Sequence, residues 1–117
     1  MDYVDGFVLA VSKAKVEDYK KSAQLGCQVW MEHGALSYVE TFADDVAEGE
    51  LTSFPRAVLL KDDEIVVFAW ATYTSRAHRD EVMAKVMADP RMKPDMEDMP
   101  FDGKRMIYGG FQAFVAA

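Results

Sequence analysis

Residues 65–71 read Ile-Val-Val-Phe-Ala-Trp-Ala and lie within the most apolar run of the chain. The run is short and rich in β-branched and aromatic residues, which predicts a β-strand. Successive side chains of a strand point to opposite faces of its sheet. One face would carry Ile65, Val67, Ala69 and Ala71, and the other Val66, Phe68 and Trp70. Because both sets are apolar, we expect a sheet that is covered on both faces.

Strands and helices alternate outward from this run. Strands are expected over 3–11, 36–43, 65–73 and 106–115, and helices over 16–33 and 75–88. Residues 57–61 fit either a short extra strand or a connection. Gly6 predicts a bulge, and Gly109-Gly110 a loosening of the last strand. Gly34 would end the first helix and Ser75 would cap the second. Asp89-Pro90 would start one more helical turn. Asp102-Gly103 would form a turn within the Pro- and Asp-rich connection 93–104.

The order β-α-β-β-α-β is that of the split βαβ pattern, the ferredoxin-like fold of the α+β class. Its antiparallel sheet carries both helices on one face, and 117 residues suffice for one domain over residues 1–117. The other face would leave large side chains such as Phe68 and Trp70 in water, at about 1.5–3 kcal/mol for each. A second sheet is the simplest cover. The sequence therefore predicts a homodimer, a dimeric α+β barrel whose two sheets meet around a shared interior.

Composition excludes several partners. The 13 Lys and Arg against 20 Asp and Glu give a net charge of -7, which repels phosphate backbones and anionic lipids, so we expect no nucleic acid. No apolar run approaches the ~20 residues of a membrane span, so we expect no membrane. Asp2 and Asp5 stand where a signal peptide carries basic residues, and Cys27 has no partner for an intrachain disulfide. We therefore expect a cytoplasmic protein.

Catalytic motifs are absent from the sequence. It contains no GxGxxG, P-loop or GxSxG, and His33 and His78 lack a neighbouring HxxxH or CxxC, so no cofactor and no metal site is predicted. His33, at a helix end, is better placed for capping than for catalysis. His78 fits a packed or hydrogen-bonded helix position, and Cys27 fits a buried thiol better than a nucleophile.

The stretch 108–115 resembles the aromatic RNP strand of RNA-recognition motifs. That signature belongs on the third strand of its fold, whereas this one lies on the last. The acidic charge also opposes phosphate binding, so we set this reading aside.

The remaining candidate is a pocket in the barrel interior, on the second face of the sheet, where Trp70 and Phe68 could meet Tyr38 or Tyr108. It would bind or transform a small, largely apolar molecule between sheet and helices. Trp70, Tyr38 and Tyr108 would supply aromatic walls, Glu40 a base or hydrogen-bond acceptor, and Arg105 a cation for an anionic substituent. Phe68 and Gln112 are possible further members. The same aromatic residues also suit packing at a dimer interface. The second hypothesis is therefore a non-enzymatic dimerisation or interaction module that acts through the exposed stretch 44–50 or 95–102, and whether the chain is an enzyme stays open.

Several segments, spread over almost the whole chain, resemble the YbaA-like family of uncharacterised bacterial proteins (domain of unknown function 1428). They are Tyr3-Val-Asp-Gly-Phe-Val-Leu9, Glu32-His-Gly-Ala-Leu-Ser-Tyr38, Ser53-Phe-Pro55, Val66-Val-Phe-Ala-Trp70, Ser75-Arg-Ala-His-Arg-Asp80, Lys85-Val-Met-Ala-Asp-Pro-Arg91 and Met99-Pro-Phe-Asp-Gly-Lys-Arg-Met-Ile-Tyr-Gly-Gly-Phe111. The resemblance implies a dimeric α+β barrel and no established activity. Proteins with that barrel include antibiotic-biosynthesis monooxygenases, muconolactone isomerases and haem-degrading enzymes, and His78 is the only counterpart here of a haem-ligating histidine. Fold alone does not carry function.

Overall fold

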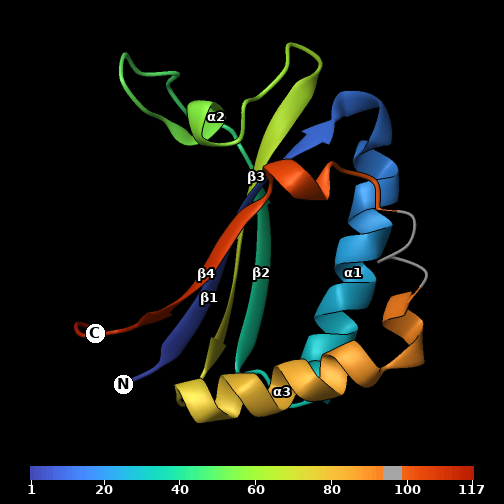
Figure 1. Cartoon of the computed structure of the whole chain (residues 1–117), viewed down its shortest axis with the longest axis vertical. Coiled ribbons are helices and arrows are strands. Elements are labelled where there is room, and N and C mark those ends of the chain that lie inside the picture. The colour runs from blue at the N-terminus through green and yellow to red at the C-terminus, as the bar shows by residue number, and fades with distance from the viewer. Residues whose placement is uncertain (94–98) are drawn as a thin grey trace.

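Two long antiparallel strands form the centre of the sheet in the computed structural model of the chain, which describes residues 1–93 and 99–117. They are β1 (Tyr3–Ser12) and β3 (Glu64–Tyr73), which pair along their whole length (Figure 1). β2 (Ser37–Phe42) borders β3, and β4 (Ile107–Gln112) borders β1, both antiparallel. The order β2-β3-β1-β4 is that of a ferredoxin-like fold and confirms the predicted class.

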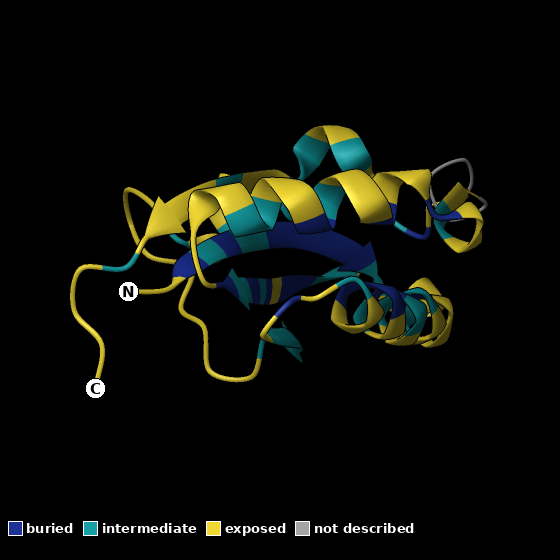
Figure 2. Ribbon diagram, turned by 90° about the horizontal axis from the view of Figure 1, so that it is seen from below, coloured by how far each residue is buried: buried dark blue, intermediate teal, exposed yellow. Residues whose placement is uncertain are grey.

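The two long helices lie on one side of the sheet (Figure 1). α1 (Val16–Glu32) follows a short 3₁₀ turn, η1 (Lys13–Lys15), and α3 (Arg76–Ala88) lies across its lower end. Both helices bury the side that faces the sheet and expose the other (Figure 2). As predicted, Gly34 follows α1 with a φ of 110°, and the Ser75 hydroxyl caps α3 by accepting from the His78 amide at 3.1 Å. Asp89 likewise caps η2 (Pro90–Met92).

The hydrophobic core lies mainly between the sheet and these two helices. One cluster joins Tyr3, Ala71 and Tyr73 of the sheet to Val29 and Trp30 of α1 and Val82 and Val86 of α3. A second joins Leu9, Val11, Val67 and Ala69 to Tyr19. No helix within the described ranges has both the length and the hydropathy to cross a membrane.

Among the described residues, those that cover the opposite face of the sheet lie at one end of it. There Val58 is fully buried against Val8, Ala10 and Val66. Further along the same face the rings of Phe68 and Trp70 lie 5.5 Å apart, and 41% of Phe68 is exposed. In the single chain, therefore, only part of the apolar second face of β3 is covered.

The structure decides one alternative that the sequence left open and differs from three local predictions. Residues 57–61 form no strand, because Ser53 and Pro55 instead start a short helix, α2 (Phe54–Ala57), whose Arg56 amide donates to the Ser53 hydroxyl. Gly6 causes no bulge, since it pairs in register with Trp70 and Gly109. The last strand ends at Gln112, opposite the first residue of β1, so residues 113–115 have no strand to pair with. Asp102-Gly103 begins a 3₁₀ helix, η3 (Gly103–Arg105), and residues 94–98 of the predicted connection lie outside the described residues.

Candidate functional site

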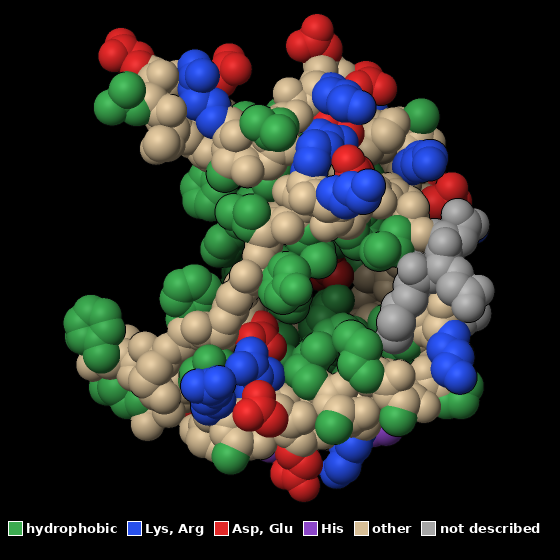
Figure 3. Space-filling view, viewed as in Figure 1, with side chains coloured by type: hydrophobic (Ala, Val, Ile, Leu, Met, Phe, Trp, Pro, Cys, Tyr) green, Lys and Arg blue, Asp and Glu red, His purple; other side chains and the backbone are tan. Residues whose placement is uncertain are grey.

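A cavity of about 680 Å³ lies between the helix side of the sheet and the helices α1 and α3. Figure 3 shows a hollow at this place, surrounded by hydrophobic side chains. The cavity exists because the residues above and below it are small: Ala69 lies on its floor, and Ala23 and Gly26 of α1 lie on its roof. Its volume falls within the range of about 300–1,000 Å³ that is usual for small-molecule sites.

Aromatic and methionine side chains form most of the wall. Methionine is flexible and polarizable, so a wall rich in this residue adapts to ligands of different shape. The rings of Phe7 and Tyr108 stack at 6.3 Å, and Tyr108, 71% exposed, lies at the outer edge of the sheet. The wall comprises Phe7, Trp30, Phe101, Tyr108, Met83, Met87, Met92, Met99 and Met106.

One carboxylate on this wall, that of Glu40, accepts hydrogen bonds from two tyrosines. Tyr38 donates to Oε2 at 2.6 Å, and Tyr19 of α1 donates to Oε1. Burial, and then the neighbouring Glu40 charge, raise the pKa of both phenols well above the ordinary value, so both hydroxyls stay protonated. Because each carboxylate oxygen has two lone pairs and these bonds use one on each, Glu40 retains acceptor capacity.

A second polar group on the wall is a neutralised ion pair. Arg79 of α3 donates from Nη1 to Asp5 of β1 at 2.6 Å and from Nε to Asp80 at 2.7 Å. Its guanidinium also stacks 5.0 Å from the centre of the Tyr3 ring. The hydrogen bond to Asp80 and the charge of Asp5 raise the pKa of Arg79, which keeps it charged.

Four of the six predicted ligand residues line this cavity: Tyr38, Glu40, Trp70 and Tyr108. Trp70 borders it, but its ring packs against Phe68 on the opposite face of β3. The other two residues lie elsewhere.

Arg105 and His78 do not line the cavity. Arg105 donates to Glu64 at 2.6 Å and to the Leu59 carbonyl at 3.0 Å, so it fastens η3 to the sheet and is not placed to hold an anionic substituent there. His78 accepts from the Thr74 amide at 3.0 Å and meets the Tyr73 ring edge-on, as a packed helix histidine does.

Three further polar residues of the cavity wall were not predicted from the sequence: Tyr19, Asp5 and Arg79. Tyr19 has the spacing of an ordinary core residue of α1, and the sequence around Arg79 carries no signal. Asp5 does carry one, because an acidic residue at an inward position of an apolar strand needs a partner.

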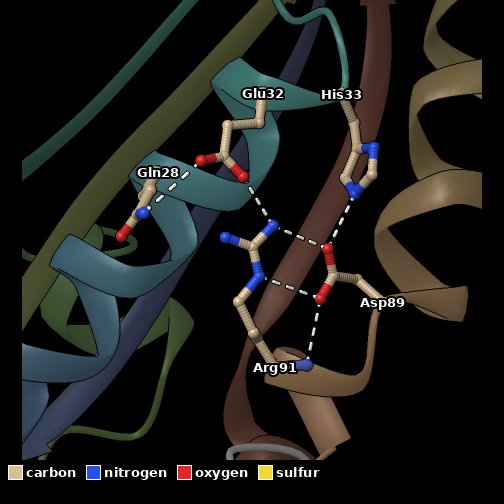
Figure 4. Close-up of polar contacts among 5 residues, drawn as sticks. All are labelled: Gln28, Glu32, His33, Asp89 and Arg91. Atoms are coloured by element: carbon tan, nitrogen blue, oxygen red, sulfur yellow. Dashed lines mark hydrogen bonds and ion pairs between the residues drawn. The ribbon is translucent and has the colours of Figure 1, made fainter.

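A cluster of polar residues fixes one end of the cavity wall (Figure 4). Asp89 accepts from Arg91 Nε at 3.0 Å and from Nη2 at 2.8 Å, and His33 Nε2 lies 2.8 Å from it. Arg91 also donates to Glu32 at 2.6 Å. The hydrogen bonds of Arg91 and His33 lower the pKa of Asp89 well below its usual range. The cluster joins the end of α1 to η2 and so positions Met92 on the cavity wall.

The polar groups of the described residues include no set of three or more His, Cys, Asp or Glu side chains that would hold a metal ion. Cys27, half-buried, lines a smaller cavity of about 230 Å³ that shares Glu40 with the main one.

A profile of the family described as "Protein of unknown function (DUF1428)" matches residues 2–103. The chain belongs to the DUF1428 family. It is 49% identical to the uncharacterized protein YbaA of Escherichia coli K12 over 115 residues, which are 98% of each chain. The matched range spans the strands β1 to β3 and both long helices of this chain, and Glu40 lies within it.

Two solved structures resemble this DUF1428 chain in fold. A putative antibiotic biosynthesis monooxygenase from Nitrosomonas europaea matches with a TM-score of 0.60 and 11% identity, over 97% of this chain and 90% of that one. A dimeric ferredoxin-like protein from an uncultured marine organism matches with a TM-score of 0.54 and 12% identity, over 100% and 98%. At these identities the likeness supports the ferredoxin-like fold of the DUF1428 chain alone.

Proposed function

We propose that this protein binds a small, largely apolar molecule in the cavity under α1 and α3, and that Glu40 accepts a hydrogen bond from it. The observation that carries this proposal is the Glu40 carboxylate, an acceptor with unused capacity in the wall of a 680 Å³ cavity that is otherwise mostly apolar. Such a cavity, with a few convergent polar groups, is the usual form of a small-molecule site. The apolar wall would supply affinity and Glu40 would orient the ligand.

We also propose that two copies pair through the second face of the sheet. The rings of Phe54, Phe68 and Trp70 form a continuous aromatic cluster there, with neighbouring centroids 5.6 and 5.5 Å apart. Phe68 is 41% exposed and Phe111 63% exposed, and large exposed apolar surfaces mark interaction sites. A copy of the same chain offers the same apolar surface, and one structural neighbour is described as dimeric.

Binding and pairing are therefore not competing uses of one set of aromatic residues. Tyr38 and Tyr108 belong to the cavity, whereas Phe68 and Trp70 belong to the opposite face of the sheet. The proposed ligand lies between sheet and helices, not between the two sheets of a dimer.

A thermal-shift screen tests the binding proposal, because a ligand that binds the folded state raises its melting temperature. The library includes aromatic amines, alcohols and acids as well as haem and flavins. Hits should stabilise the wild-type protein and the control variant Glu48→Gln, an identical change in the exposed loop, but should stabilise Glu40→Gln much less. Silence across the library would favour an interaction module that acts through residues 44–50. Hits that Glu40→Gln does not weaken would refute the role of Glu40 in binding.

A further inference from the structure

Glu40 is a cavity carboxylate that no cation neutralises within residues 1–93 and 99–117. The other cavity carboxylate, Asp5, is paired with Arg79 at 2.6 Å. Lys20 lines the smaller cavity beside Glu40, but its ammonium group pairs with Glu17 at 3.3 Å. Among the described residues, the charged side chains that line the main cavity are Asp5, Arg79 and Glu40. Arg79 is the cation among them and it pairs with Asp5 and Asp80, so the charge of Glu40 is left without a partner.

The hydroxyls of Tyr19 and Tyr38 satisfy only part of this carboxylate. They replace two of the hydrogen bonds that water would donate, but a neutral phenol supplies no opposite charge. A charged donor forms a stronger hydrogen bond to a carboxylate than a neutral donor does. A cation that can also donate would therefore bind Glu40 more strongly than a further neutral donor would.

Aromatic rings gather around the same carboxylate. The Tyr19 ring meets Phe42 at 6.2 Å and Phe101 at 5.9 Å, and the Tyr38 ring meets Trp30 at 5.5 Å. Aromatic faces attract organic cations through their quadrupole. They also pack well against the apolar part of such a ligand. The net charge of -7 on the chain also raises the local concentration of cations.

A row of residues on the floor of the cavity leads from Glu40 across the sheet. Strand pairing places Glu40 beside Ala69, Ala69 beside Phe7, and Phe7 beside Tyr108, so the four residues form one row across the sheet. At a spacing of about 4.8 Å between strands, the row is about 14 Å long. Its middle positions present only a methyl group and a phenyl ring.

We propose that the ligand is an organic ammonium ion, an amine with an apolar body, whose charged nitrogen lies against Glu40 and whose body follows the row towards Tyr108. This inference rests on the proposed small-molecule site and names its ligand class. Carboxylic acids are disfavoured, because Arg79 is already paired with Asp5 and Asp80 and no other cation lines the main cavity in the described part of the chain.

Three naphthalene derivatives of similar size and different charge test the ligand class: 1-naphthylmethylamine, 1-naphthylmethanol and 1-naphthoate. Their dissociation constants are measured by NMR titration of backbone amides at low salt. The amine should bind about tenfold more tightly than the alcohol, and the acid most weakly. The affinity of the amine, but not of the alcohol, should fall as salt is added. Glu40→Gln should bring the amine to the affinity of the alcohol, and Glu48→Gln should change neither.

The wild-type ranking decides the result even where Glu40→Gln does not fold. Equal affinities of amine and alcohol, or tighter binding of the acid, overturn the ammonium assignment and leave the small-molecule site standing. Failure of all three compounds, together with silence in the thermal-shift screen, overturns the site itself.

Discussion

The hydroxyl oxygen of Tyr38 lies only 2.8 Å from the position that a Cβ atom on Gly26 would occupy. The next atom of Tyr38, Cζ, would be 3.5 Å away, which is ordinary van der Waals contact. Gly26 is therefore the residue of α1 that makes room for the hydroxyl donating to Glu40.

Gly26→Ala should destabilise the protein by about 1–3 kcal/mol, because the added methyl overpacks against the Tyr38 hydroxyl. In a Tyr38→Phe background the same change should be neutral or stabilising by up to about 1 kcal/mol, because alanine is the better helix former. Urea unfolding of the four proteins measures this coupling as a double-mutant cycle. Equal effects of Gly26→Ala in both backgrounds would show that the close approach is unimportant.

Glu64→Gln should cost about 1.5–3 kcal/mol at pH 7, the usual value of hydrogen bonds to a charged group, because Arg105 donates to both of its oxygens. These bonds lower the pKa of Glu64 from 4.5 to about 2. A depressed pKa stabilises the folded state above the unfolded value, and this stability is lost as the pH falls from about 5 towards 2. Urea unfolding between pH 7 and pH 2 should show a weaker acid dependence in Glu64→Gln than in Glu48→Gln. The same dependence of stability on pH in both variants would show that the pair of Glu64 and Arg105 does not contribute to acid unfolding.

Asp89→Asn should lower the melting temperature more than Glu32→Gln does. Asp89 is 9% exposed and receives the side chains of both Arg91 and His33, whereas Glu32 forms its ion pair at the surface. Thermal unfolding at pH 7, monitored by circular dichroism, compares the two variants. A larger decrease in melting temperature for Glu32→Gln would show that the ion pair between Glu32 and Arg91 stabilises the cluster more than Asp89 does.

Phe68→Glu should turn the proposed dimer into a monomer, since a charge in the middle of an apolar interface is left unpaired. Met31→Glu is the matched control, because Met31 is exposed to the same extent, 42% against 41%, but belongs to α1 on the other side of the sheet. Light scattering at micromolar concentration gives the mass of each. A monomeric wild-type protein would refute the pairing.

The sequence predicted the order of the helices and strands well, but it predicted poorly which side chains lie on the same face of the sheet. Periodicity in residues 65–71 is a property of one strand, and it correctly gave two apolar faces. Which residues of β2 share a face with Trp70 depends on register, and a slip of one residue moves every side chain to the other face. Tyr38 pairs with Ala71, so it lies opposite to Trp70.

Ion-pair partners were harder still to predict. Arg105 was assigned to a ligand, but Glu64, 41 residues earlier in the chain, holds it. Such pairs form between distant segments, and in a chain with 20 acidic residues no local pattern selects one of them. Ser75 and Asp89 were placed correctly because a helix cap is set by its immediate neighbours.

The cavity and the uncovered aromatic surface lie on opposite sides of a single layer of strands. Two copies paired through the second surface would therefore carry two separate ligand sites facing outward, with a stoichiometry of one ligand per chain. Neither copy would contribute atoms to the other's site, so occupancy of one would leave the other sterically free. Mutations that abolish self-association would leave the ligand contacts in place, and either property is free to change in evolution while the other is kept.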